Sequence, residues 1–383
     1  MPSLLLPQAD RSLRAYSPRS DASVYPSSAP PARSRIAFAA AHVVCDPLAD
    51  AGPERAALDW EATIAFRRHL WSLGLGVAEA MDTAQRGMGL DWPTSRELIR
   101  RSAAEARGPL VCGAQTDQLE PGGARSLDDV VAAYEEQCEL IESAGAGVVL
   151  MASRELCRLA RGPEDYVEVY SRVLGGLRRP AILHWLGAAF DPQLAGYWGD
   201  ADLDRATEIC LSLLAANAAR IGGIKISLLD QRREVAMRRR LPEGIHVYTG
   251  DDFDYPTTIA GDGEHHSDAL LGAFDMIAPA AAAALAAMDS GEEAGFHRIL
   301  ERSLPLSRHV FEAPTWAYKT GVVFLAYLNG HQDHFRMVGG MEGARSLVHM
   351  SRLFVLADEA DLLRDPDLAA ARMRPLLALG GVA

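Results

Sequence analysis

The chain has 383 residues, of which 49% are hydrophobic, enough for one large barrel with additions or for two ordinary domains. Its formal net charge of −13 argues against nucleic acid as a partner, because phosphate binding needs clustered lysine and arginine side chains. No apolar run reaches membrane-spanning length, and Pro7, Gln8 and Asp10 interrupt the N-terminal leucines before a signal peptide can form.

The five cysteines are scattered, odd in number and lack any C-x-x-C spacing. They are Cys45, Cys112, Cys138, Cys157 and Cys210. This pattern is typical of reduced thiols rather than of a disulfide framework, so we expect a cytoplasmic protein.

Residues 1–34 are rich in proline, serine, arginine and alanine, which predicts an extended N-terminal arm. From about residue 35, short apolar runs alternate with segments of helical periodicity, as in folds with buried parallel strands. The predicted strands are Ile36–Val44, Gly76–Met81, Pro109–Gln115, Gly147–Ala152, Pro180–Leu186, Ile221–Ser227, Ile245–Thr249 and Phe274–Ala278. Eight strand–helix units without a Rossmann glycine signature predict an α/β protein with a closed (β/α)8 TIM barrel over residues 35–290.

Residues 291–383 are predicted to form a C-terminal helical extension. The predicted helices are Phe296–Phe311, Pro314–Asn329, Gly343–Asp358 and Pro366–Leu377. Their apolar faces exceed what one flank of a barrel can cover, so we expect a homo-oligomer, a dimer or tetramer, with these helices at the interface.

One predicted strand carries a lysine, Lys225, near its carboxyl end. Burying an ammonium group is costly unless the group is paired or loses its proton. A neutral amine is a nucleophile for carbonyl carbon, which is the requirement of Schiff-base catalysis. The alternative is a lysine that simply extends to water at the end of its strand.

Gly223-Ile224-Lys225 and the later Gly250-Asp251-Asp252 resemble the Gly-Ile-Lys strand and the Ser/Thr-Gly-Asp-Asp turn of the dihydrodipicolinate synthase / N-acetylneuraminate lyase superfamily. The resemblance runs from about residue 36 to 329. It implies a Schiff-base lyase or aldolase on a (β/α)8 barrel, with Lys225 on the sixth strand. It also implies that Asp251 and Asp252 order the pocket wall or bind a substrate hydroxyl.

The resemblance assigns a second catalytic position on the fifth predicted strand. In the family this strand carries a tyrosine that shuttles protons around the lysine, and His184 takes its place here. Histidine can do the same work because its pKa lies near neutrality. The alternative is an imidazole that merely packs in the core.

The loop after the second strand departs from the family. In the family this loop carries a Gly-Thr-Thr-Gly-Glu signature that holds the substrate carboxylate. In this chain only Thr83 of the signature is kept, and Asp82, Gln85 and Arg86 take the place of its other residues. Arg86 could hold a carboxylate with two hydrogen bonds, or it could be a solvated loop residue. Thr83, Asp82 and Arg86 are therefore candidate substrate-binding residues.

The leading hypothesis is a Schiff-base lyase, aldolase or dehydratase acting on a small keto acid or sugar-derived carbonyl compound. A second is a metal-dependent isomerase or aldolase, and a third is a barrel that keeps the lysine but only binds. The candidate ligands of the second are Glu79, Asp82, His184, His246 and Asp251.

A long polar loop, Phe253–Ser267, is predicted to lie over the catalytic mouth. Its Asp262, Glu264, His265 and His266 could bind a divalent metal, but adjacent side chains rarely converge on one ion. A solvated loop is favoured, so we expect no metal and no other cofactor.

Overall fold

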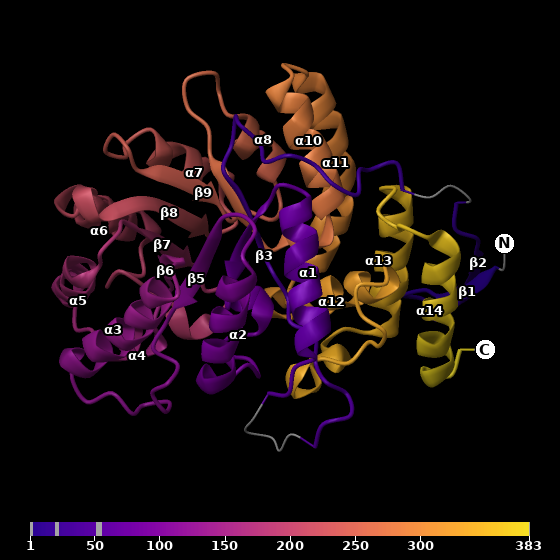
Figure 1. The fold of residues 1–383 in the computed structure, drawn as a ribbon, viewed down its shortest axis with the longest axis horizontal. Coiled ribbons are helices and arrows are strands. Elements are labelled where there is room, and N and C mark those ends of the chain that lie inside the picture. The colour runs from indigo at the N-terminus through magenta and orange to yellow at the C-terminus, as the bar shows by residue number, and fades with distance from the viewer. Residues whose placement is uncertain (1–2, 20–22, 51–55, 383) are drawn as a thin grey trace.

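The computed structural model describes residues 3–19, 23–50 and 56–382. Its centre is a closed barrel of eight parallel strands, in the order β10-β3-β4-β5-β6-β7-β8-β9 (Figure 1). The strands are β3 (Ala37–Ala40), β4 (Gly76–Glu79), β5 (Leu110–Ala114), β6 (Gly147–Leu150), β7 (Ala181–Leu186), β8 (Ile221–Ser227), β9 (His246–Thr249) and β10 (Asp268–Leu271). The (β/α)8 barrel expected from the sequence is confirmed.

Helices follow the strands and form the outer layer of the barrel (Figure 1). They are α1 (Trp60–Ser72), α2 (Trp92–Glu105), α3 (Leu127–Ser143), α4 (Arg154–Leu159), α5 (Pro163–Gly176), α6 (Leu203–Ala216), α7 (Gln231–Arg238), α8 (Tyr255–Ala260), α9 (Ala273–Met276) and α10 (Ala278–Asp289). Short polar residues begin several of them: Asp59, Asp91, Ser126 and Asp202 each accept a hydrogen bond from a first-turn N–H group.

The last barrel strand is not the one that the sequence predicts. Phe274–Ala278 is expected from the sequence to be a strand, but the strand is β10 and Phe274 lies in α9. Two short apolar runs cannot be told apart by periodicity. Barrel closure decides between them, because Ala269 pairs with Ala37 of β3 and Asp268 with Tyr248 of β9. The expected Phe253–Ser267 loop likewise contains a helix, α8.

The chain continues into four long C-terminal helices beside the barrel (Figure 1). They are α11 (Glu293–Val310), α12 (Tyr318–Leu328), α13 (Leu347–Glu359) and α14 (Pro366–Leu379). The N-terminal segment forms a hairpin of β1 (Leu4–Pro7) and β2 (Leu13–Tyr16) against these helices. Tyr16 Oη donates a hydrogen bond of 2.6 Å to Asp358 of α13. Part of the predicted arm, residues 1–2 and 20–22, lies outside the described residues.

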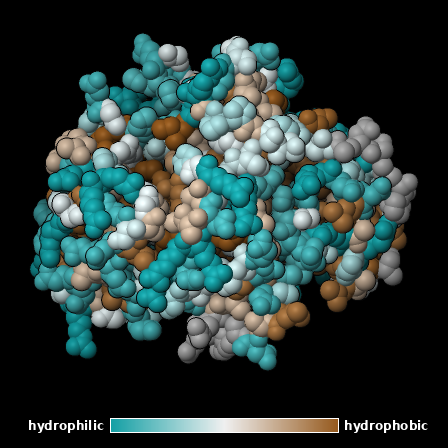
Figure 2. All heavy atoms as spheres, viewed as in Figure 1, coloured by the Kyte–Doolittle hydropathy of each residue, from teal (hydrophilic) through white to brown (hydrophobic). Residues whose placement is uncertain are grey.

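The molecular surface is predominantly hydrophilic on the face shown in Figure 2, where hydrophobic residues occur in separate small patches. Among the described residues, no helix combines the length and the apolar character needed to cross a bilayer.

An apolar cluster fills the interior of the barrel and shows which strand residues point inward. Ile182 and Tyr248 belong to a buried cluster that also includes Phe38, Ala40, Ala78, Met81, Val111, Val149, Met151 and Leu270. Successive side chains of a strand point to opposite faces. His184, two residues after Ile182, therefore also points inward, and so does its register partner Lys225, which also pairs with Tyr248.

A buried ion pair joins the first helix to the second barrel strand. Arg67 of α1 donates from Nε and Nη2 to the two carboxylate oxygens of Glu79, both at 2.8 Å, and both side chains are fully buried. Ser102 of α2 donates a third hydrogen bond to Glu79, at 2.6 Å. Glu79, a candidate ligand in the metal hypothesis, is thus engaged in holding the barrel wall.

Replacing Arg67 with methionine should lower the free energy of unfolding by about 3–5 kcal/mol, because it leaves the Glu79 carboxylate buried without its counter-ion. The matched control is Arg68→Met, since this neighbouring arginine is partly exposed and pairs with Glu61 and Glu105 near the surface. Urea denaturation checks both variants. Similar small losses for the two would contradict the structural role of the buried pair.

Candidate active site

Lys225 lies near the carboxyl end of β8 and is only 7% exposed. Gly250 leaves space for the Lys225 side chain because glycine has no side chain of its own. A Cβ atom on Gly250 would lie 3.0 Å from Lys225 Cε and 2.2 Å from Ser227 Oγ. Among the described residues, the Lys225 amine forms no hydrogen bond and has no carboxylate oxygen within 4.0 Å. A buried amine in this state is free to react.

Burial lowers the pKa of Lys225 below its usual value, although the charges of Asp82 and Asp252 oppose the shift. Desolvation penalises the ammonium form, so a larger share of this amine is neutral at pH 7 than for an exposed lysine. The direction of this shift favours the neutral form that an imine-forming lysine requires.

His184 is fully buried beside Lys225. Its Nε2 lies 3.1 Å from Ser227 Oγ, while its Nδ1 lies 4.0 Å from Asp82 and has no hydrogen-bond partner in the part of the chain that the structure describes. Burial and the neighbouring Lys225 charge lower the pKa of His184 well below its usual value. The imidazole is therefore neutral near pH 7, which suits a proton acceptor better than the acid that the sequence suggests.

The two aspartates of the Gly-Asp-Asp turn differ in their surroundings. Burial raises the pKa of Asp252 to about 7, and the charge of Lys225 partly offsets this rise. Asp252 Oδ1 accepts a hydrogen bond of 2.9 Å from the N–H of Ala273. Asp251 is also buried, and its oxygen accepts the N–H of Phe253 at 2.9 Å. Of the two carboxyl groups, it is Asp252 whose charge acts on Lys225.

Thr83 lies in a short 3-10 helix, η1 (Asp82–Ala84), and contacts a residue that is 235 positions away. Its Oγ1 is 2.9 Å from the hydroxyl of Tyr318, the first residue of α12. The Tyr318 ring stacks on Phe311, with centroids 4.4 Å apart, and meets the edge of Phe190 at 6.0 Å. These aromatic contacts bring the C-terminal helices to the loop after β4.

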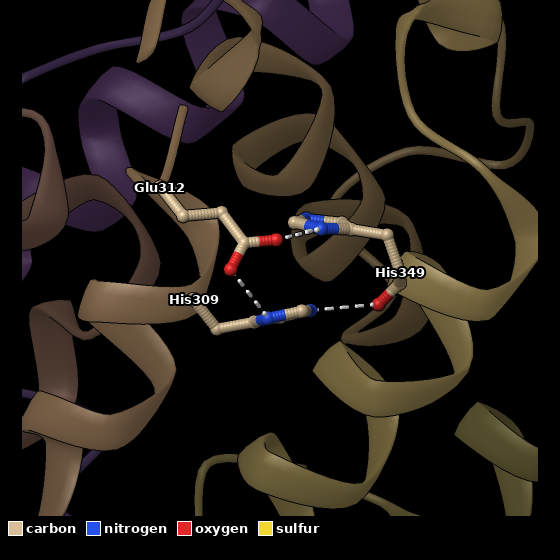
Figure 3. Close-up of side chains that lie close together, drawn as sticks. All are labelled: His309, Glu312 and His349. Carbon is tan, nitrogen blue, oxygen red and sulfur yellow. Dashed lines mark hydrogen bonds and ion pairs between the residues drawn. The ribbon is translucent and has the colours of Figure 1, made fainter. Parts of the chain in front are cut away.

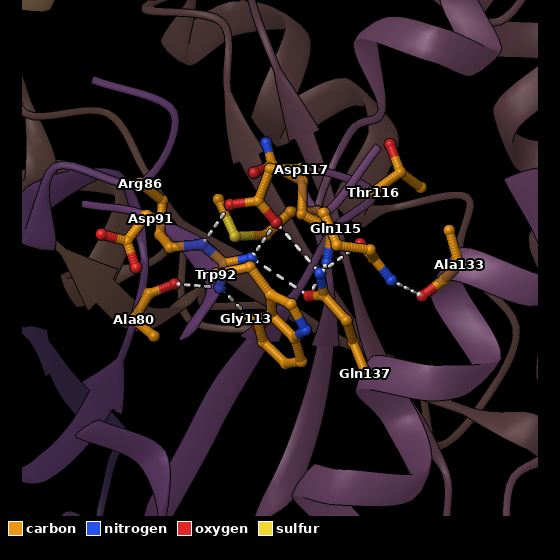
Figure 4. A network of polar contacts seen from close by, with 12 residues as sticks. Ala80, Arg86, Asp91, Trp92, Gly113, Gln115, Thr116, Asp117, Ala133 and Gln137 are labelled. Carbon is orange, nitrogen blue, oxygen red and sulfur yellow. Dashed lines mark hydrogen bonds and ion pairs between the residues drawn. The ribbon is translucent and has the colours of Figure 1, made fainter. Parts of the chain in front are cut away.

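Arg86 is buried inside a hydrogen-bond network instead of facing a pocket (Figure 4). Its Nε and Nη2 donate to the two oxygens of Asp117, and Nη2 also donates to Gln137. Its Nη1 donates to the carbonyl oxygens of Ala80 and Gly113, at 3.3 and 3.2 Å. All five donors are used, so the expected grip on a substrate carboxylate would require breaking this network.

A second buried lysine, Lys319, follows Tyr318 in α12 and is 3% exposed. Its Nζ donates to the carbonyl oxygen of Trp316 at 3.2 Å and lies 3.4 Å from the sulfur of Met88. Burial lowers the pKa of Lys319 to about 8, against the opposing charge of Asp82. The sequence interpretation missed this residue, and only the scarcity of lysine in the chain could have indicated it.

Apart from His184 and Asp82, which lie 4.0 Å apart, the residues expected as metal ligands do not gather into a group of three in the described part of the chain. His246 lies at the opposite, amino end of β9, half-exposed and bonded to Asp268 at 2.7 Å. In the 253–267 segment, Asp262 accepts the guanidinium of Arg239 at 2.8 Å and the N–H of His265 at 2.8 Å. These contacts use the oxygens that a cation would need.

Within the described residues, a different group converges in the way that a metal site requires: His309, Glu312 and His349 (Figure 3). Glu312 lies 3.5 Å from His309 Nδ1 and 3.1 Å from His349 Nδ1. The two rings are stacked with centroids 3.9 Å apart, so they would have to separate before both could bind an ion in their planes. The group lines a cavity of about 390 Å³ between the hairpin and α13 that contains no barrel residue.

Gly250→Ala should lower the free energy of unfolding by about 1–3 kcal/mol, because the added methyl group collides with Ser227 and displaces Lys225. Gly222→Ala on β8 is the control, since its added Cβ meets nothing closer than 3.6 Å. Urea denaturation measures both. Equal stability of the two variants would show that the space above Lys225 is not tightly filled.

Residues 4–382 match the family described as "Protein of unknown function (DUF993)". No curated protein matches the chain. Similar solved structures include a putative dihydrodipicolinate synthetase from Pseudomonas aeruginosa, with 16% identity and a TM-score of 0.64 over 85% of this chain and 99% of that one. YagE from E. coli K12, solved in complex with pyruvate, has 14% identity and a TM-score of 0.66 over 86% and 99%.

Dihydrodipicolinate synthase from Aquifex aeolicus gives 14% identity and a TM-score of 0.64 over 86% of this chain and 99% of that one. These likenesses concern the fold, and they confirm the barrel that the sequence resemblance implied. The chain therefore belongs to the DUF993 family, and its barrel has the fold of the dihydrodipicolinate synthase family.

Proposed function

We propose that this protein is a Schiff-base lyase, aldolase or dehydratase that acts on a small carbonyl compound, either a keto acid or a sugar derivative. The observation that supports this most directly is the state of Lys225 on the sixth strand of the barrel, a buried amine that forms no ion pair with any residue the structure describes. The YagE structure contains pyruvate, which makes pyruvate the first keto acid to test.

In the proposed reaction the neutral Lys225 amine attacks the carbonyl carbon, and the resulting carbinolamine loses water to form an imine. Loss of water needs a proton donor. Asp252 suits this role because its raised pKa of about 7 keeps much of the carboxyl group protonated near neutral pH. The neutral His184 then serves as a proton acceptor next to Ser227.

The anionic end of a keto acid needs a partner other than Arg86. Arg154, the first residue of α4, donates from Nε to Asp191 at 2.6 Å, and its terminal nitrogens form no hydrogen bond with a described residue. They lie close to Gly87, in the loop that follows η1. We therefore assign the carboxylate contact to Arg154, and keep Thr83 and Asp82 of η1, which precedes Gly87 in the chain, as further candidates.

A homo-oligomeric assembly and a cytoplasmic location stay predictions from the sequence. Exposed leucines on the hairpin and on α14, Leu5, Leu13 and Leu379, lie in the region where subunit contact is expected.

Treatment with pyruvate and borohydride, followed by peptide mass mapping, should place one adduct on Lys225. Lys225→Ala and Lys225→Arg should both lose the adduct and all turnover, because guanidinium cannot be deprotonated. Both variants should keep the fold, measured by circular dichroism. A panel of keto acids and sugar-derived aldehydes extends the test; an adduct elsewhere, or none with any probe, would end the Schiff-base proposal and favour a binding barrel.

Asp252→Asn should slow imine formation by about 10²–10⁴-fold, because the amide can still accept the Ala273 N–H but cannot release a proton. In the wild type the protonated fraction of Asp252 falls as pH rises through its pKa of about 7, so this contribution to the rate should fall above neutral pH. The variant should lose that limb of the pH profile. Trapping rates measured from pH 5 to 9 check this, and an unchanged profile would exclude Asp252 as the acid.

A further inference from the structure

The chain contains 36 arginines but only two lysines, Lys225 and Lys319. Where the fold needs a fixed positive charge it uses arginine, as in the buried contacts of Arg67 with Glu79 and of Arg86 with Asp117. Both lysines are more than nine-tenths buried, and neither has a carboxylate oxygen within 4.0 Å among the described residues. A lysine that served only as a buried charge would need such a partner. The use of lysine instead of arginine at these two buried positions therefore indicates that each position needs an amine that can lose its proton.

The position of Lys319 connects it with the barrel site. It follows Tyr318, whose hydroxyl contacts Thr83 at 2.9 Å, and its Nζ lies 3.4 Å from Met88 in the loop after η1. Asp82, next to Thr83, lies 4.0 Å from His184, which pairs with Lys225 in the barrel, and its charge acts on both lysines. Both amines thus border one loop, although they come from β8 and from the C-terminal α12.

The immediate contacts of the Lys319 amine are neutral: a carbonyl oxygen, a thioether sulfur and the face of the Tyr318 ring, 4.6 Å from Nζ. Such contacts stabilise an ammonium less than a carboxylate would, and burial lowers the pKa of Lys319 to about 8. An amine that titrates close to neutral pH can both take up and release a proton during turnover.

We propose that Lys319 is a second functional amine of the barrel site, which exchanges protons with the carbon atom next to the imine on Lys225. This inference rests on the proposed function. The neutral Lys319 amine removes a proton from that carbon, and the C–H electron pair forms a carbon–carbon double bond. The π electrons of the protonated imine move to its nitrogen, which leaves a neutral enamine. The Lys319 ammonium later returns the proton to the same carbon. The substrate class is thus a carbonyl compound with a hydrogen on the adjacent carbon.

The test uses pyruvate, or the first carbonyl probe that the wild type traps, in deuterated water. Proton NMR then measures the exchange of the probe's adjacent C–H protons for deuterium. Lys319→Arg keeps the charge but cannot lose a proton, whereas Lys319→Gln removes both. Both variants should still form the borohydride adduct on Lys225 and should exchange deuterium about 10²–10⁴-fold more slowly than the wild type. Urea denaturation confirms that each variant is folded.

Wild-type exchange in Lys319→Arg would overturn the proposal, because it would reduce Lys319 to a fixed charge. If the wild type forms no borohydride adduct on Lys225, the proposed function is rejected, and the role of Lys319 is rejected with it. A second measurement does not depend on a substrate. Reductive methylation with ¹³C-formaldehyde can label only the two lysines and the chain's N-terminal amine. The Lys319 signal is identified as the one that is present in the wild-type spectrum and absent from the spectrum of Lys319→Arg. In the wild type it should titrate near pH 8. A titration midpoint above about 10, the pKa of an ordinary lysine, would contradict the proposal.

Discussion

The burial of an amine without a counter-ion is the constraint on which the site depends. Desolvation of an ammonium group costs free energy that the fold must recover elsewhere. Here the closed parallel barrel holds Lys225 inward through its pairing with His184 on one side and Tyr248 on the other. Gly250 contributes by having no side chain, which leaves room for the lysine. The more distant charges of Asp82 and Asp252 limit the shift in pKa without pairing with the amine.

Arginines stabilise the frame around this titratable centre. Arg67 joins α1 to β4, and Arg86 holds the loop after β4 through Asp117, Gln137 and two carbonyl oxygens. A guanidinium keeps its charge at any accessible pH and matches carboxylate geometry. The loop after β4 is therefore held by guanidinium hydrogen bonds, while the groups expected to exchange protons have pKa values shifted by burial.

The C-terminal helices contribute to the site as well as to the bulk of the fold. Tyr318 reaches the loop after β4 through its contact with Thr83, and stacking on Phe311 fixes its ring. Lys319 is placed next to that loop by the same helix. Loops at the carboxyl ends of barrel strands usually carry the function of this fold. Here α12 lies against one of them and adds side chains that the barrel itself does not have.

The amino-acid sequence by itself determined the barrel, because eight apolar runs alternating with helical segments allow few other arrangements. It also indicated Lys225, since a lone lysine at the end of an apolar strand is unusual, and the resemblance to the dihydrodipicolinate synthase superfamily pointed to His184 on the neighbouring strand. Periodicity could not distinguish β10 from the Phe274–Ala278 segment, because both are short apolar runs and only barrel closure separates them.

Only the tertiary structure decided how each candidate side chain is used. In the sequence, Arg86 and Asp251 are both loop residues that could bind substrate. In the structure, Arg86 is enclosed by hydrogen-bond acceptors, and Asp251 accepts a hydrogen bond within its own turn. Lys319 lies 94 positions after Lys225, and no local pattern relates the two. Their proximity to the same loop depends on long-range packing of α12, and their pKa values depend on burial, which is a property of the folded chain alone.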